Sequence, residues 1–446
     1  MKRVTNMTEG SAAKLILSFA FPLILTNVGQ QLYMIVDASV VGRGVGVKAL
    51  AAVGSTDWSY WMILWTITGL TQGFSTFVSR YFGEQNYRKM NRAIAMSTLL
   101  CIVVGAFLTI VGLLSARPLL LLLKTPADIL DGAAVYLLTM IAGTLIVMAY
   151  NMAASILRAF GDGRSPLLAM LIAAFLNVGL DLLFVLAFHW GIFGAAIASV
   201  TAQLVSFLYC LGQIKKIEYV QIRKEDWKPE SGMLRELLVF GLPIAFQYIV
   251  IAVSGMVLQS TINKQGSIFV AGYTACNKLY GLLESTAISL GFAFSTFFAQ
   301  NYGAGNKKRV RDGVKTGLKI STAMAACVTG LMIFIGKYLL QMFINTGENE
   351  GPKALQIAWY YLIVMSVCLI ILYLIHVYRN ALQAMGNSFW SMISGFAECG
   401  VRIVMAKVIV FWLGNEILFY IEPAAWLGAL LFIMLPYYSF QKKLLS

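Results

Sequence analysis

Two stretches of this chain, about 220 residues apart, carry almost the same sequence. Residues 74–86 read FSTFVSRYFGEQN, and residues 294–306 read FSTFFAQNYGAGN. Two other landmarks recur: Pro22 in the first half matches Pro243 in the second, and Leu157–Gly161 matches Leu382–Gly386. Landmarks that recur in the same order at nearly the same spacing indicate that one ancestral half was used twice. A duplicated apolar chain is typical of a transporter, with its site between or inside the halves.

The composition indicates an integral membrane protein. Of the 446 residues, 59% are hydrophobic and only 12% are charged, and the mean hydropathy is +0.76. A soluble protein carries roughly twice that charged fraction. Apolar runs of about 20 residues without strict alternation predict membrane-spanning helices rather than a barrel. The fold class expected is therefore all-α.

The apolar runs predict twelve transmembrane helices. They cover residues 14–40, 52–78, 93–116, 131–153, 165–187, 191–212, 236–261, 268–299, 313–336, 354–379, 389–414 and 421–440. With the N-terminus inside, 24 of the 34 Lys and Arg residues fall in cytoplasmic segments and 7 in outer segments. This bias follows the positive-inside rule and places both termini in the cytoplasm, with the protein in the cell (inner) membrane. It also explains the net charge of +14 without a nucleic-acid partner.

The most polar segment predicts the domain organisation. Residues 213–235 contain many charged residues and Pro229, and they lie midway along the chain. We expect a six-helix lobe at 1–212, a cytoplasmic linker at 213–235 and a second six-helix lobe at 236–446. Six helices on each side give both lobes the same topology, as parallel repeats have.

The cysteines and the glycine-rich runs predict no metal or nucleotide site. All six cysteines lie in apolar runs and form no close pair, which favours buried small side chains over ligands or disulfides. Gly161–Gly163 and Gly303–Asn306 follow no strand and lack the Lys-Ser/Thr of a P-loop, so tight turns are expected. No cofactor is expected, and an ion gradient must supply the energy.

Several motifs together resemble the multidrug and toxic compound extrusion (MATE) family along nearly the whole chain. They are VDASVVGR followed by ALAAVG (Asp37 to Gly54), the Gly-Asn ends of the two FSTF runs, ILRAFGDGRSP (Ile156–Pro166), NVGLDLLFVLAFHWGIFGAAIA (Asn177–Ala198) and EPAAWL (Glu422–Leu427). The resemblance implies two six-helix lobes that form a V-shaped cavity. It also implies a monomer that exports small cationic amphiphilic drugs, driven by inward Na⁺ or H⁺.

One departure places the chain within that family. One branch carries a carboxylate in the seventh helix, eight or nine residues after its proline, whereas this chain has Ile251–Val253 there. The chain is therefore closer to the branch named for the DNA-damage-inducible protein F. A second-lobe cation site of the other branch's type is not supported.

A group of polar residues in the first half predicts a cation site. Asp37 lies in the first helix, and Asn177 and Asp181 are four residues apart on one face of the fifth. Asn177 lies about 18 Å from the inner end of its helix, and Ser199 about 12 Å from the outer end of the sixth, so their depths coincide in a core about 30 Å thick. Carboxylates at this depth indicate function and can hold Na⁺ or H⁺. The alternative is that Asp37 caps a helix and Asp181 bonds only to Asn177.

The second half offers substrate or second-lobe candidates. Glu398 and Arg402 are four residues apart, and a structural ion pair is the preferred interpretation. Glu284 has no obvious local partner and could bind a cationic drug or a proton. His376 could relay protons, although a packing role near Tyr378 is favoured.

Two prolines are predicted hinges. Pro22 and Pro243 would let the first and seventh helices bend, because proline removes a backbone hydrogen bond.

Two other functions compete with drug antiport. A flippase for lipid-linked oligosaccharides or other lipids should need basic residues for a diphosphate, whereas acids outnumber bases within the predicted helices. An enzyme is disfavoured because no paired-His metal motif or nucleophile constellation is present.

Overall fold

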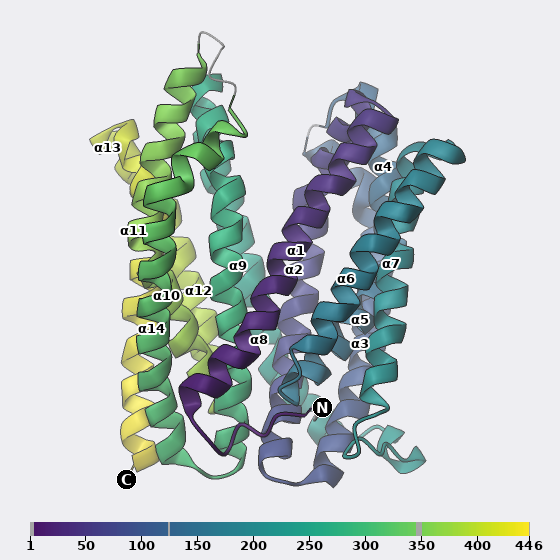
Figure 1. Cartoon of the computed structure of the whole chain (residues 1–446), viewed down its shortest axis with the longest axis vertical. Helices are drawn as coiled ribbons and strands as arrows, with labels where there is room; N and C mark the ends of the chain where they lie inside the picture. Colours follow the sequence, from purple (N-terminus) through teal and green to yellow (C-terminus); the bar gives the residue numbers. More distant parts are fainter. Residues whose placement is uncertain (1–3, 124, 345–349, 446) are drawn as a thin grey trace. The chain divides into compact units, whose positions relative to one another are not determined.

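The computed structural model describes residues 4–123, 125–344 and 350–445; Lys2, Arg3 and Lys124 of the charge count lie outside them. The helices of the first half are α1 (Ala12–Gly44), α2 (Val47–Gly83), α3 (Tyr87–Leu122), α4 (Ala127–Ala142), α5 (Thr144–Ala159), α6 (Arg164–Asp181) and α7 (Gly191–Ile214). Those of the second half are α8 (Ser231–Ile262), α9 (Ser267–Gly303), α10 (Lys307–Gln341), α11 (Gly351–Ala384), α12 (Ser388–Val404), α13 (Val410–Leu413) and α14 (Ile421–Leu445) (Figure 1).

All twelve predicted spans are helical, and the all-α membrane fold class is confirmed. Within the described ranges, nine single helices are long and apolar enough to cross a membrane, and the pair α4–α5 makes a tenth. The remaining two predicted spans are α2 and the run from α12 to α13, which are helical but more polar. Most helices begin or end several residues beyond the predicted bounds.

The chain divides into two compact units. Unit 1 comprises Met1–Asn6 and Phe21–Ala245, and unit 2 comprises Met7–Ala20 and Phe246–Ser446. Unit 2 therefore includes the first turns of α1, and unit 1 includes the first turns of α8. The division falls within α1, two residues before Pro22, and within α8, just after Pro243. The lobe boundaries expected at 212 and 236 stay a prediction.

Unit 1 is built on α2 and α7. The first packs against α3, α4 and α5, while the second packs against α4, α5 and α6. The predicted fourth span is broken at Gly143, where α4 and α5 meet at 47°. A Cβ on residue 143 would lie 2.5 Å from a Val200 methyl group of α7, so only glycine allows this close approach.

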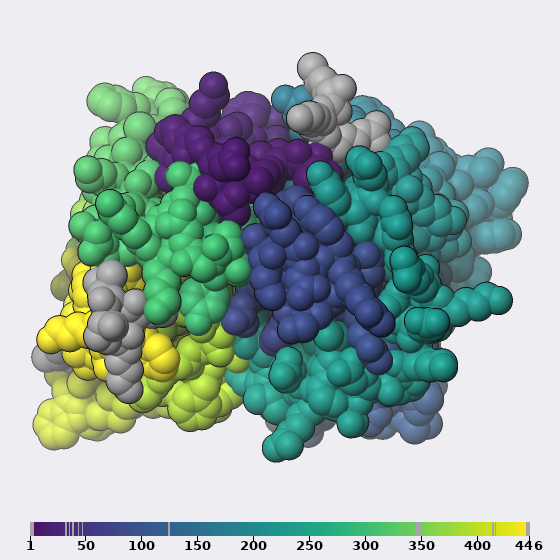
Figure 2. Space-filling model, turned by 90° about the horizontal axis from the view of Figure 1, so that it is seen from below, coloured from purple at the N-terminus to yellow at the C-terminus, as the bar shows by residue number. Residues whose placement is uncertain are grey.

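Unit 2 is organised around α11, which packs against α9, α10 and α14, while α12 packs against α14 (Figure 1). Residues 7–10, just before α1, are anchored here. The Met7 N–H donates to Gln300 Oε1 at 2.9 Å, and its carbonyl accepts from Asn301 Nδ2 at 3.0 Å. Arg309 donates to the carbonyls of Met7 and Gly10. Figure 2 shows these purple N-terminal atoms against the green atoms of unit 2.

The repeated motifs form the same turns in both halves. Asn86 and Asn306, the last residues of the FSTF runs, accept hydrogen bonds from the N–H groups of Lys89 at 3.1 Å and Arg309 at 3.0 Å. These asparagines cap α3 and α10 and satisfy donors that a helix N-terminus leaves free. The tight turns predicted at Gly161–Gly163 and Gly303–Asn306 are both present, between α5 and α6 and between α9 and α10.

Both halves also interrupt the same span. A π-helical segment, Leu182–Ala187, follows α6, and another, Met405–Ile409, follows α12. In such segments each N–H bonds to the carbonyl five residues earlier rather than four, and they occur frequently at functional sites. Each directly follows a helix that carries predicted site residues.

Candidate functional site

The predicted cation-site residues of the first half come together in unit 1. Asn177 and Asp181 lie on α6, Ser199 lies on α7, and Asp37 lies inside α1 rather than at its end. Asn177 and Asp181 are fully buried, whereas Asp37 is partly exposed. We refer to these four residues as the acidic cluster.

Asn177 connects the two helices of the acidic cluster. Its amide nitrogen donates to Asp181 Oδ2 at 2.7 Å, while its oxygen accepts from the Ser199 N–H at 3.0 Å and from Ser199 Oγ at 3.2 Å. The opposite amide orientation would face oxygen toward carboxylate and is excluded on chemical grounds. The four-residue spacing on α6 therefore does place both side chains on one face.

The two carboxyl groups of the acidic cluster are neighbours. Asp37 and Asp181 are close enough to share a hydrogen bond, which requires a proton on one of them. Within the described ranges, Oδ1 of each has no protein partner although both atoms are buried. Buried carboxylate oxygens are costly unless they are paired. The cluster therefore offers two hard oxygen atoms, next to an amide and a hydroxyl, to a proton or a small cation.

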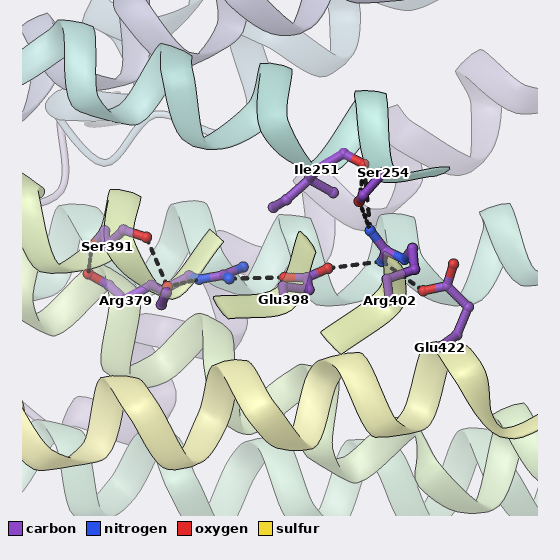
Figure 3. A network of polar contacts seen from close by, with 8 residues as sticks. Ile251, Ser254, Arg379, Ser391, Glu398, Arg402 and Glu422 are labelled. Carbon is purple, nitrogen blue, oxygen red and sulfur yellow. Dashed lines mark hydrogen bonds and ion pairs between the residues drawn. The ribbon is translucent and has the colours of Figure 1, made fainter. Parts of the chain in front are cut away.

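A chain of ion pairs occupies the interior of unit 2 (Figure 3). Arg379 of α11 donates to Glu398 Oε2 of α12 at 2.9 Å, and Arg402 of α12 donates to Glu398 Oε1 at 3.0 Å. Arg402 also donates to Glu422 Oε2 of α14 at 2.7 Å. The side chains of Arg379, Glu398 and Arg402 are at most 6% exposed. We call these four residues the ion-pair network.

Neutral groups complete the ion-pair network. Arg379 Nε donates to Ser394 Oγ at 2.8 Å, and Arg402 contacts Ser254 Oγ and the carbonyl of Ile251 on α8. The network therefore ties α8, α11, α12 and α14 to one another. The ion pair that the spacing of Glu398 and Arg402 predicts is present, but it is one link of a longer chain.

Sequence reasoning missed two members of this network. The sequence predicts that the tenth span ends at Arg379, whereas α11 continues to Ala384 and buries this arginine. Gly386, with a φ of 90°, is a helix-stop signal that could have extended the span. Glu422 belongs to the EPAAWL motif, but nothing in the sequence indicates that it pairs with Arg402, because the fold alone brings the two together.

The remaining candidates lie elsewhere in unit 2. Glu284 forms a side-chain hydrogen bond with Tyr280 one turn earlier, which corrects the expectation that it has no local partner. His376 packs against α9, where a Cβ on Gly291 would lie 3.0 Å from its Nδ1. This close packing agrees with the packing role favoured for His376, and its chemical role stays a prediction.

Comparison with known proteins identifies relatives along most of the chain. A family model named MatE matches residues 22–183 and 243–408, which include both halves of the repeat. Probable multidrug resistance protein YpnP of Bacillus subtilis is 29% identical over 361 residues, 79% of each chain. Probable multidrug resistance protein YoeA of the same organism is 26% identical and covers 95% of this chain and 93% of its own.

Solved structures share the fold. A MOP superfamily transporter from Pyrococcus furiosus, described as having a binding pocket of reversed polarity, superposes with a TM-score of 0.92 at 22% identity. It covers 100% of this chain and 99% of its own. An outward-facing multidrug resistance MATE family transporter of the same superfamily gives a TM-score of 0.89 at 22% identity, with the same coverage.

Proposed function

Because this chain belongs to the MATE family, we propose that it is a secondary active antiporter that exports small cationic amphiphilic drugs in exchange for inward Na⁺ or H⁺. The observation that carries the proposal is the acidic cluster. Asp37 and Asp181 place two unpartnered carboxylate oxygens in the helices of unit 1. Ionisable groups at membrane depth are costly, and by default they mark ion pathways.

The relatives support drugs as the cargo. YpnP and YoeA are named as probable multidrug resistance proteins, and MepA of Staphylococcus haemolyticus, 22% identical over 90% of this chain, is named as a multidrug export protein. We place the protein in the cell membrane as a monomer, with both termini in the cytoplasm.

Coupling follows from differential affinity. A cation that binds the acidic cluster more tightly in one conformation than in another shifts the protein toward the first. The proton shared by Asp37 and Asp181, or a Na⁺ held by their free oxygens with the Asn177 and Ser199 oxygens, would neutralise part of the buried charge. Either ion would then favour the conformation in which these side chains lie together.

The flippase alternative finds little support in unit 2. Both buried guanidinium groups, Arg379 and Arg402, are held by carboxylates. Neither is available as an unpaired positive group for a lipid diphosphate.

The test is gradient-driven efflux of a cationic dye from proteoliposomes, with Na⁺ and pH gradients imposed separately. Asp37→Asn and Asp181→Asn should each abolish coupled efflux, and the double variant should be little worse because both residues serve one site. Asp131→Asn is the matched control, since that side chain is 83% exposed and forms a surface pair with Arg117. Wild-type coupling in both single variants would refute the acidic cluster as the coupling site.

A further inference from the structure

We propose that a basic stripe on α10 binds the phosphate headgroup of an anionic phospholipid, in the leaflet at the N-terminal end of that helix. In the proposed orientation this is the cytoplasmic leaflet. The basic stripe consists of Lys308, Arg311, Lys315 and Lys319. The inference concerns a membrane partner of unit 2, and it does not depend on which compound the protein exports.

The four residues of the basic stripe lie on one side of α10. They follow one another at intervals of three, four and four residues, and side chains at these spacings are neighbours on a helix surface. The three lysines are exposed, and the side chain of Arg311 is 31% exposed. Within the described ranges, the stripe makes a single ion pair, between Arg311 Nε and Asp312 Oδ1 at 3.5 Å. The stripe therefore presents an excess of positive charge to an anionic ligand.

The position of the basic stripe along α10 places it at a membrane surface. Lys319 and Lys337 bracket the uncharged part of this helix, and they are 18 residues apart, which corresponds to about 27 Å. A bilayer core is about 30 Å thick, so both lysines lie near its edges. Tyr437 of α14, which feels the charge of Arg311, and its neighbour Tyr438 are residues of the kind that gathers at membrane interfaces. The stripe therefore runs through the layer that the lipid headgroups occupy.

The surface of α10 beyond the basic stripe suits an acyl chain. Thr322, Ala323 and Ala326 are exposed, small and uncharged. They lie three, four and seven residues after Lys319, and so share its side of the helix. An acyl chain can therefore lie against α10 directly next to a headgroup that the stripe holds. A positive surface that continues into an apolar one fits a phospholipid better than a soluble phosphate compound.

The matched helix of unit 1, α3, shows that the repeated fold does not require this charge. The capping residues Asn86 and Asn306 align the two helices. The residues of α3 that correspond to the basic stripe are Arg88, Asn91, Ala95 and Leu99. Asn91 is buried, because its side chain donates to the Tyr219 carbonyl at 3.0 Å and accepts from the Gln221 N–H at 2.9 Å. Unit 1 thus covers this side of α3 with the linker, whereas the same side of α10 is basic and exposed.

The experiment measures ligand binding to the delipidated full-length protein by native mass spectrometry. The probes are dioleoylphosphatidylglycerol, which is anionic, dioleoylphosphatidylcholine, which has the same acyl chains but no net charge, and glycerol 3-phosphate, which has no acyl chain. Phosphatidylglycerol should bind most tightly. The double variant Lys315→Gln with Lys319→Gln should lower its affinity by about tenfold or more, because each basic side chain near an anionic lipid adds to the attraction. Lys315→Arg with Lys319→Arg keeps both charges and should bind as the wild type does.

The matched control is Arg88→Gln with Lys89→Gln, which removes two exposed basic residues from the corresponding end of α3. It should leave the affinity for phosphatidylglycerol nearly unchanged. Equal losses in the two glutamine variants would show that the lipid responds only to overall charge, and this result would overturn the basic stripe as a site. Unchanged binding in the α10 variant would overturn it as well. Glycerol 3-phosphate that binds as tightly as phosphatidylglycerol would identify a soluble ligand instead, and equal binding of the two lipids would exclude recognition of the headgroup charge.

Discussion

Glu398 shares its carboxylate between two guanidinium groups, and this sharing decides what its substitution does. If Glu398 and Arg402 formed an isolated pair, the double variant Glu398→Arg with Arg402→Glu would keep the attraction. In the network, however, these two substitutions would bring a second arginine against Arg379 and a second glutamate against Glu422. The double reversal should therefore not recover the stability lost by either single reversal, although an isolated pair would predict recovery.

A neutral double variant is the appropriate test of the network. Glu398→Gln strands the buried Arg379 and should cost about 3–5 kcal/mol, because an unpaired charge remains in the interior. Removing both groups with Arg379→Gln and Glu398→Gln leaves Arg402 paired with Glu422 and should recover much of that loss. The measurement is the unfolding temperature in detergent.

The exposed pair Arg117–Asp131, 3.0 Å apart, is the control for this comparison. Its neutralisation should change stability by less than about 1 kcal/mol. A double network variant no more stable than Glu398→Gln would show that the Arg379–Glu398 contact does not stabilise unit 2.

Within the acidic cluster, removing Asn177 should reduce cation affinity more than removing the Ser199 hydroxyl. Asn177→Ala would leave Asp181 Oδ2 without its amide donor and would remove the oxygen that accepts from Ser199, whereas Ser199→Ala removes one hydroxyl and leaves the backbone contact to Asn177. A net hydrogen bond is worth about 0.5–1.5 kcal/mol, and an orphaned buried group costs about 1–3 kcal/mol. The apparent affinity for the driving cation should therefore fall further in Asn177→Ala. The reverse order in a cation titration of efflux would contradict this assignment.

At the scale of helices, short-range sequence patterns predicted the spans and some of the turns but not the breaks within spans. Apolar runs located all twelve spans, and the Gly-Asn ends of the FSTF runs marked turns whose asparagines cap the next helix. The break between α4 and α5 falls at a single glycine, Gly143, and its close approach to Val200 on another helix could not be read from the local sequence. The π-helical segments after Asp181 and Val404 likewise interrupt apolar sequence without any breaker residue.

The candidate site was predictable only where its residues share a helix. The four-residue spacing of Asn177 and Asp181, and of Glu398 and Arg402, showed which side chains share a face. The partners that each face meets depend on tertiary packing. For that reason Glu422 was quoted in a motif without being linked to Arg402, and the order of the network was not foreseen.

The positions of two prolines argue for bending of α1 and α8. Pro22 and Pro243 lie within continuous helices, close to the residues where each helix passes from one unit to the other. A proline removes one helical hydrogen bond and lowers resistance to bending there. Pro22→Ala and Pro243→Ala should slow efflux and leave drug binding measurable.

Pro436 provides the matched control for the hinge prediction. It also lies inside a helix, α14, but that helix stays within unit 2. Transport rates in proteoliposomes should be nearly unchanged in Pro436→Ala. Equal slowing in all three variants would indicate a general effect on helix packing rather than hinges at the unit boundaries.

For the whole chain, the repeat preserves the scaffold while its chemistry diverges. Each half places an i, i+4 polar pair on the helix that precedes a π-helical segment. In unit 1 this pair is an amide and an acid that meet a second acid. In unit 2 it is an acid and a base inside a chain of alternating charges. Unit 1 therefore retains free oxygens for a cation, whereas the paired carboxylates of unit 2 are already satisfied.

The charge distribution along the whole chain predicts its orientation in the membrane. Basic residues outnumber acidic ones in the segments assigned to the cytoplasm, and the linker that contains Glu225 is one of them. Glu225 is exposed, so a cysteine there should react with thiol reagents wherever they can reach it. In a variant without the native cysteines, an impermeant maleimide added to intact cells should leave Glu225→Cys unlabelled. It should label Lys264→Cys, an exposed position between α8 and α9 on the predicted outer side. Both should react after the cells are opened. Labelling of Glu225→Cys and protection of Lys264→Cys in intact cells would invert the orientation, and the direction proposed for export would have to be reversed with it.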